Sequence, residues 1–271
     1  MQNNRFTTAF KKYVRNLYFL FFLNGLLAAS LFFFATESGY ETELFSAISR
    51  EIKTELNPGY TKEDYTIKAL QTSNYLQQRR YYIFGKQEIG GIKANIFHPS
   101  TIDLMTNKGA CGSYVTVLSR ILKSNDIKVR IGQMKVKGTF GGHMIVEANL
   151  NDRWVVLDPT YSICFRNPDS SLASFADLKK NWNYYKNQAP PDYDENYKFE
   201  DVRYTNWEKV PVILPVTKKI LDWVLGKETA DGISIRPYLL RNYHKLAWIN
   251  CIVLIIVFLF TLKVYRKQKQ L

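Results

Sequence analysis

The sequence predicts an α+β domain held between two membrane-spanning helices. Three observations support this: long uncharged apolar runs near both ends of the chain, helical periodicity after the first run, and alternating apolar residues between turn signals further on. Of the 271 residues, 46% are hydrophobic and 15% are aromatic, which excludes a disordered chain and is enough for a folded core.

The two apolar runs, residues 17–35 and 246–262, contain no charged residue. A membrane-spanning helix needs about 17–25 apolar residues, so each run is long enough. A cleaved signal peptide is the alternative for the first run, because small residues near its end resemble a cleavage site. A buried core helix is the alternative for the second, but Trp248 and Tyr265 near its ends favour a membrane span.

Basic residues flank both runs on their outer sides and orient the chain. Neither residues 1–16 nor residues 263–271 include an acid. Their basic residues are Arg5, Lys11, Lys12 and Arg15, and Lys263, Arg266, Lys267 and Lys269. Because Lys and Arg gather on the cytoplasmic side of membranes, we expect two cytoplasmic tails and an extracytoplasmic region over residues 36–245. Basic residues just before the second run argue weakly for the reverse.

The charge and cysteine content of the extracytoplasmic region exclude two classes of protein. The tails supply +8 of the formal net charge of +13, so residues 36–245 carry +5, too little to indicate nucleic-acid binding. Cys251 lies in the second apolar run, which leaves only Cys111 and Cys164 outside the predicted spans. The domain therefore has no disulfide framework. A bridge between these two cysteines stays open as the less favoured alternative.

Two scaffold helices are expected at the start of this region. Residues 41–56 place apolar side chains on one side and end at the turn signal NPGY. The sequence TKED at residues 61–64 has a capping-box pattern and predicts the start of a second helix, which runs toward Tyr82.

A buried helix is predicted to begin at Cys111. The stretch GACGSYVTVLSRIL, residues 109–122, has apolar residues at the i, i+3, i+4 and i+7 positions of a helix. They are Tyr114, Val117, Leu118, Ile121 and Leu122. A cysteine at a helix N-terminus lies near unpaired N–H groups and the positive end of the helix dipole, both of which favour the thiolate.

Strands follow this helix. Alternation over residues 127–131 predicts one strand, and GTFGG at residues 138–142 predicts a turn. HMIVEA and RWVVLD, residues 143–148 and 153–158, predict two more strands joined by a hairpin loop.

The hairpin brings a histidine and an aspartate together. A four-residue loop places His143 directly opposite Asp158, whereas a two-residue loop of Asn151 and Asp152 places His143 opposite Thr160 with Asp158 as the diagonal neighbour. Both loops put the two side chains on one face, because side chains alternate with a period of two. A three-residue loop with a bulge would separate them.

Cys111, His143 and Asp158 together form a candidate nucleophile, base and orienting acid. Taken singly, each has an ordinary structural interpretation: a small buried thiol, a hydrogen-bonded histidine, and an aspartate in the turn LDPT. Their order along the chain and the hairpin geometry favour a joint role.

The blocks GACGSY, GGHMIVE and RWVVLDPTY resemble the three signature blocks of the transglutaminase-like superfamily over about residues 60–165. The resemblance implies a papain-like α+β domain there, with residues 166–245 as a membrane-proximal extension. It implies that Cys111 is the nucleophile, His143 the general base and Asp158 the orienting acid. In relatives, the two residues after the histidine are often alanine and tryptophan, whereas here they are Met144 and Ile145. The backbone N–H of Cys111 is the expected donor to the oxyanion, and no residue of this sequence is matched to a second donor.

The chemistry expected from this resemblance is attack of the Cys111 thiolate on a carboxamide or peptide carbonyl to form a thioester. An amine that resolves the thioester makes the protein an acyltransferase, and water makes it a cysteine protease or amidase. A catalytically silent binding or scaffolding module in a membrane assembly is the alternative. No cofactor or metal is expected, and the expected partners are a protein or peptide substrate and the lipid bilayer, not nucleic acid.

Several other residues carry weaker expectations. His98 and His244 are interpreted as structural or interfacial. Five aromatic residues near the start of the extension are Trp182, Tyr184, Tyr185, Tyr193 and Tyr197. They are expected in the core or against the membrane, with a substrate groove as the alternative. The acidic segment QAPPDYDENYKFED, residues 188–201, contains the last two of these tyrosines and predicts a surface connection.

Overall fold

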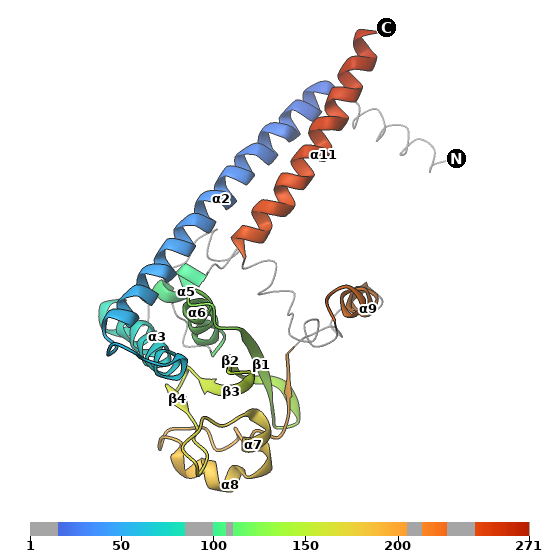
Figure 1. Cartoon of the computed structure of the whole chain (residues 1–271). Coiled ribbons are helices and arrows are strands. Elements are labelled where there is room, and N and C mark those ends of the chain that lie inside the picture. The colour runs from blue at the N-terminus through green and yellow to red at the C-terminus, as the bar shows by residue number, and fades with distance from the viewer. Residues whose placement is uncertain (1–15, 85–99, 107–110, 205–212, 227–241, 271) are drawn as a thin grey trace. The chain divides into compact units, whose positions relative to one another are not determined.

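The computed structural model describes residues 16–84, 100–106, 111–204, 213–226 and 242–270 (Figure 1). The chain divides into two compact units: Met1–Tyr40 with Asn242–Leu271, and Glu41–Arg241. Its helices are α2 (Leu17–Thr54), α3 (Lys62–Phe84), α5 (Ser100–Thr106), α6 (Cys111–Lys123), α7 (Phe175–Lys180), α8 (Trp182–Tyr185), η1 (Lys186–Gln188), α9 (Ile213–Leu225) and α11 (Tyr243–Lys269). Its strands are β1 (Val129–Val136), β2 (Thr139–Leu150), β3 (Arg153–Asp158), β4 (Ile163–Cys164) and β5 (Val202–Arg203).

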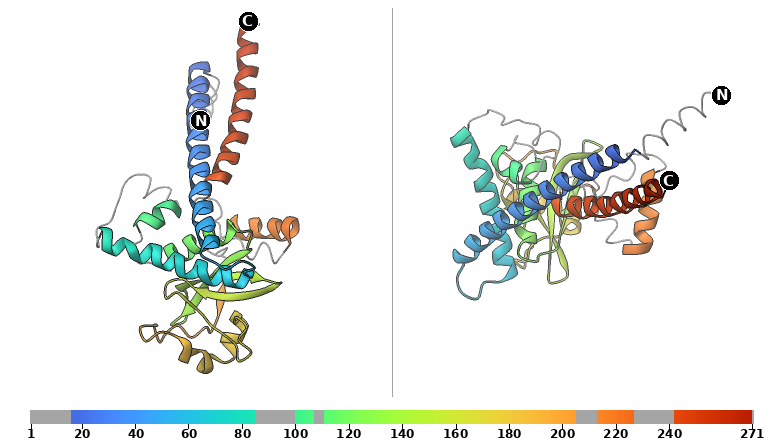
Figure 2. Two further views of the ribbon diagram at one scale, coloured as in Figure 1. Left: turned by 60° about the vertical axis from the view of Figure 1, so that its left-hand side comes forward. Right: turned by 90° about the horizontal axis from the view of Figure 1, so that it is seen from above.

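The first unit is an antiparallel pair made by α11 and the first part of α2, which lie side by side in both views (Figures 1 and 2). Both helices are long and apolar enough to cross a membrane, and only 6% and 17% of their apolar windows are buried. The low burial distinguishes them from the core helices of a soluble protein. The Asn24 amide donates to the Thr261 hydroxyl at 2.9 Å and the Asn250 amide to the Ser30 hydroxyl at 2.7 Å. Such bonds hold helices together in lipid.

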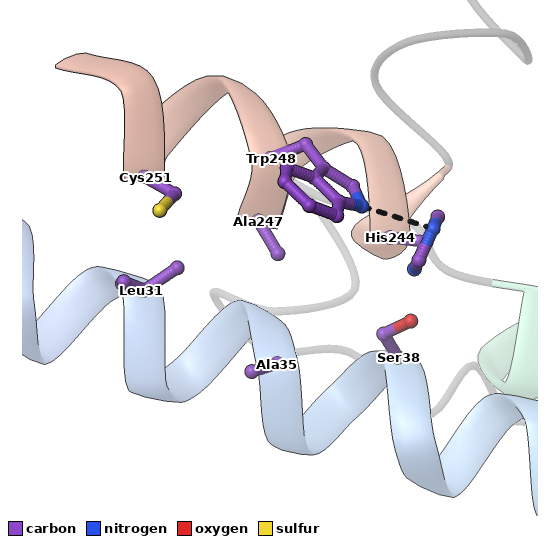
Figure 3. A pocket seen from close by; sticks show the side chains of 7 residues that line it. All are labelled: Leu31, Ala35, Ser38, His244, Ala247, Trp248 and Cys251. Carbon is purple, nitrogen blue, oxygen red and sulfur yellow. Dashed lines mark hydrogen bonds between the residues drawn. The ribbon is translucent and has the colours of Figure 1, made fainter.

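A pocket of about 280 Å³ lies between these two helices (Figure 3). Its lining includes the small residues Ala35, Ser38 and Ala247, which leave the space open. At one end, the Trp248 indole N–H donates to Nε2 of His244 at 3.2 Å. His244 is thus a hydrogen-bonding residue of the helix pair.

The helix α2 is longer than the sequence predicted. Separate helices were expected over residues 17–35 and 41–56, but one helix runs from Leu17 to Thr54. The intervening residues include no proline, and Gly39 has nothing within 4 Å of where a side chain would start. A single glycine lowers helix stability by only about 1 kcal/mol, so it does not end the helix.

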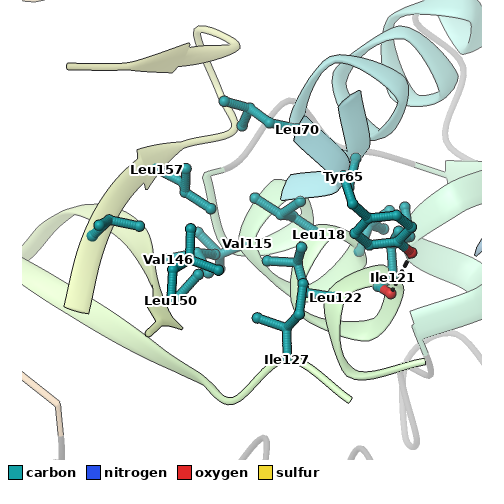
Figure 4. Close-up of a cluster of buried hydrophobic side chains, with 14 of the residues drawn as sticks. Tyr65, Leu70, Val115, Leu118, Ile121, Leu122, Ile127, Val146, Leu150 and Leu157 are labelled. Carbon is teal, nitrogen blue, oxygen red and sulfur yellow. Dashed lines mark hydrogen bonds between the residues drawn. The ribbon is translucent and has the colours of Figure 1, made fainter. Parts of the chain in front are cut away.

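The second unit is mixed α+β and contains an antiparallel five-stranded sheet of order β4-β3-β2-β1-β5. The helices α3 and α6 cover one face, and α7 and α8 lie on the other side (Figures 1 and 2). The core on the α6 side is drawn in Figure 4. It unites Phe45 and Ile52 of α2 with apolar side chains of α3, α6, β2 and β3. The predicted antiparallel α+β class is therefore confirmed.

The predicted helix starts also agree with the structure. The helix α6 begins at Cys111, and its predicted apolar residues are buried. The helix α3 begins after Thr61, whose hydroxyl accepts from the N–H of Asp64 at 3.1 Å. The Asp64 carboxylate accepts from the N–H of Thr61 at 2.8 Å, which completes a capping box.

Two turns differ from the first expectation. The turn between β1 and β2 is formed by Lys137 and Gly138, both with positive φ, and residues 139–142 belong to β2 rather than to a loop. The register shifts between Met134 and Lys135, which pair with His143 and Phe140. Gly141 and Gly142 of β2 are thereby left unpaired in a β-bulge. The β2–β3 loop is the two-residue alternative, because Leu150 pairs with Arg153. The four-residue loop was wrong.

Candidate functional site

The site starts at Cys111, the first residue of α6, which is partly exposed. Its helix is fixed by the Ser113 hydroxyl, which donates to Asp103 of α5 at 2.9 Å. A side chain added at Gly112 would meet the Met144 sulfur at 3.7 Å. Met144, one of the two departures from the family pattern, therefore lies against the first turn of this helix.

His143 and Asp158 form the second part of the site. The register of β2 and β3 pairs Val146 with Leu157, so His143 and Asp158 are diagonal neighbours on one face. The His143 Nε2 lies 2.6 Å from Oδ2 of Asp158. Asp158 is fully buried, and its other carboxylate oxygen accepts from the N–H of Thr160 at 3.1 Å. Charge-assisted hydrogen bonds of this kind are among the strongest in proteins.

His143 links this pair to Cys111. Burial alone lowers the pKa of His143, but hydrogen bonds to Asp158 and Cys111, together with their negative charges, outweigh it and raise the pKa to about 9. Nε2 is taken by Asp158, so Nδ1 is the nitrogen available to the thiol. The structure thus brings all three predicted site residues together, with the imidazole between carboxylate and sulfur.

Two tyrosines cover the histidine and aspartate. The Tyr197 ring stacks on His143, with 4.1 Å between ring centroids and 13° between planes. The Tyr193 hydroxyl donates to Oδ2 of Asp158 at 3.0 Å. Burial and the Asp158 charge raise the pKa of Tyr193 far above its usual range, so this hydroxyl stays a proton donor. These rings leave His143 only 1% exposed.

The helix α3 supports the turn that follows Asp158. The Asn74 amide donates to the carbonyl oxygens of Pro159 and Thr160 at 2.9 and 3.1 Å. Because of these two hydrogen bonds, Asn74 is a positioning residue for the loop that follows the aspartate. Gln77, one turn further along α3, is fully buried, and neither of its amide atoms has a hydrogen-bond partner in the described part of the chain.

We expect Tyr193→Phe to raise the pKa of His143 further. The variant loses a donor that shares Oδ2 with the imidazole, so more of the carboxylate charge acts on His143. The C2 proton of His143 in NMR spectra at increasing pH measures this shift. Tyr197→Phe is the matched control, because it keeps the stacked ring and leaves the Asp158 hydrogen bonds intact. A midpoint equal in both variants would contradict this role of Tyr193.

The other cysteines and histidines singled out from the sequence lie apart from the site or outside the described residues. All three cysteines are described and free, so the Cys111–Cys164 bridge is absent from the structure. Burial raises the pKa of the Cys164 thiol. His98 lies outside the described residues. In the described ranges, no three His, Cys, Asp or Glu side chains gather in a way that could hold a metal ion.

Comparisons of the chain with protein-family models, with curated proteins and with solved structures give no match. The function is therefore inferred from the site itself. The roles of Tyr193, Tyr197 and Asn74 were not predicted from the sequence. Their signals were weak: two tyrosines among many in an irregular acidic segment, and one asparagine on the apolar side of a helix.

Proposed function

We propose that the protein is a membrane-anchored thiol enzyme of the transglutaminase-like type, with a papain-like domain, acting by acyl transfer or amide hydrolysis. The observation that carries the proposal is the 2.6 Å hydrogen bond between His143 and Asp158, with Cys111 close enough to raise the pKa of His143 and placed at the N-terminus of a buried helix. A nucleophile beside a base that is itself oriented by a third group is the geometry required for covalent catalysis.

The proposed reaction proceeds in two steps. The Cys111 thiolate attacks the carbonyl carbon of an amide and forms a C–S bond, while the backbone N–H of Cys111 stabilises the oxyanion. The C–N bond then breaks, the imidazolium of His143 gives its proton to the leaving amine, and a thioester remains. An amine or water then attacks the thioester, passes a proton to His143 and restores the thiolate.

The proposed location is a membrane, with both termini cytoplasmic and the domain extracytoplasmic. The basic tails support the orientation, and the antiparallel course of α2 and α11 agrees with termini on one side. The substrate class proposed from this location is a protein or peptide exposed on the cell surface.

Alkylation of Cys111 by iodoacetamide tests the proposal. In full-length protein with Cys164→Ala and Cys251→Ala, we expect iodoacetamide to label Cys111 rapidly at neutral pH. His143→Ala should slow this labelling strongly, because the imidazolium beside the sulfur is gone. Mass spectrometry of the labelled peptide measures both rates. A labelling rate that His143→Ala leaves unchanged would favour the silent binding module instead.

A further inference from the structure

We propose that α9 is an in-plane membrane helix that lies in the surface of the bilayer entered by α11. Its exposed apolar side chains are Val216, Ile220, Trp223 and Val224, which are 56%, 55%, 87% and 60% exposed. The spacing i, i+4, i+7 and i+8 puts them on one face of the helix. The proposal rests on the membrane location proposed above and not on the chemistry of Cys111.

This face has no covering element in the described part of the chain. No other described helix or strand packs extensively against α9. Outside α2 and α11, the other large hydrophobic side chains of the described residues with high exposure are Tyr60, Tyr75 and Tyr184, each of which has a hydroxyl for water. The exposed face of α9 is continuous and consists of aliphatic side chains and an indole, unlike these single tyrosines. Such a face marks a contact surface.

The composition and place of α9 favour lipid as the occupant. Its polar side carries Lys218, Lys219 and Asp222, with Lys218 and Asp222 joined at 2.9 Å. Lysines beside an apolar face that includes tryptophan are typical of interfacial helices, because lysine stems lie along lipid while the charges reach water. Residues 226–242 connect α9 to α11, and a chain of this length spans at most roughly 60 Å. The end of α9 therefore lies within that distance of the start of α11, where the bilayer begins.

Tryptophan quenching in vesicles tests this placement. Full-length protein is reconstituted in phosphatidylcholine and phosphatidylglycerol with bromine on the acyl chains. Subtracting the emission of Trp223→Phe from that of wild type isolates the Trp223 signal. We expect the bromine to quench most of this signal and aqueous iodide to leave it unchanged.

Two other tryptophans serve as controls. Trp248 of α11 should be quenched by bromine, and Trp182 of α8 should not. An unquenched Trp248 would refute the membrane location itself, and the proposal for α9 would fall with it. With Trp248 quenched, a Trp223 reached by iodide and not by bromine would overturn the proposal. A Trp223 shielded from both quenchers would overturn it too, because a protein surface would then cover the face.

A matched pair of variants links the effect to the apolar face. Ile220→Asn should weaken bromine quenching of Trp223, whereas Ile220→Leu, which keeps the apolar face, should leave it unchanged. Equal quenching in the two variants would contradict a lipid-bound apolar face.

Discussion

Replacing His143 with alanine is expected to lower the rate at which Cys111 is acylated by an amide by about 10²–10⁴-fold, the usual contribution of general acid–base catalysis. The variant loses both the cation that stabilises the thiolate and the proton donor for the leaving amine. Release of p-nitroaniline from an N-acyl peptide anilide by the full-length protein measures the rate.

An ester probe separates these two roles. A p-nitrophenyl ester releases a phenolate that needs no proton, so its hydrolysis should fall less than that of the anilide. His244→Ala is the matched control, because His244 belongs to the helix pair and bonds to Trp248. An anilide rate that His143→Ala leaves at the wild-type level would rule out His143 as the acid.

The pH dependence of the anilide reaction follows from the same residue. The hydrogen bonds to Asp158 and Cys111 raise the pKa of His143 to about 9, so the imidazolium is present at neutral pH. Activity that needs the imidazolium should therefore decline as pH rises through about 9. The same groups stabilise the fold fully below the unfolded pKa of about 6.5, and this stabilisation is lost as pH rises through about 9.

The spacing of apolar residues and the alternation of strand side chains made much of the site predictable. The apolar spacing after Cys111 required a buried helix, and its first residue is the cysteine. The shared face of His143 and Asp158 followed from the alternation of strand side chains, whichever even-length loop joined the strands. The loop length did not follow, because the alternation is the same for every even-length loop; the two-residue turn is seen in the structure from the positive φ of Asn151 and Asp152.

The cover over the histidine could not be predicted in the same way. Tyr193 and Tyr197 lie in an irregular segment with no hydrophobic period, and this segment leads to β5, only two residues long. Its position depends on long-range packing of aromatic rings beside the sheet, such as Phe199 on Phe165. Local sequence signals do not specify such contacts.

Arg130→Leu is expected to lower the free energy of unfolding by about 3–5 kcal/mol, because it leaves a buried carboxylate without its cation. The Arg130 Nε lies 2.6 Å from Glu147, which is 1% exposed and shares a strand with His143. The guanidinium also lies between two rings, 4.3 Å from Trp154 and 4.0 Å from Tyr204. Urea unfolding of the detergent-solubilised chain, followed by near-UV circular dichroism, measures the loss.

Two further variants separate the unpaired charge from the lost packing. Arg130→Leu with Glu147→Leu should recover most of the stability, because a well-packed apolar pair often replaces a buried ion pair without loss. Arg153→Leu breaks the exposed 2.8 Å pair with Asp177 and should cost no more than about 1 kcal/mol. A double variant as unstable as Arg130→Leu alone would assign the effect to the stacked guanidinium, and β2 would then owe its position beside the site to packing rather than to charge.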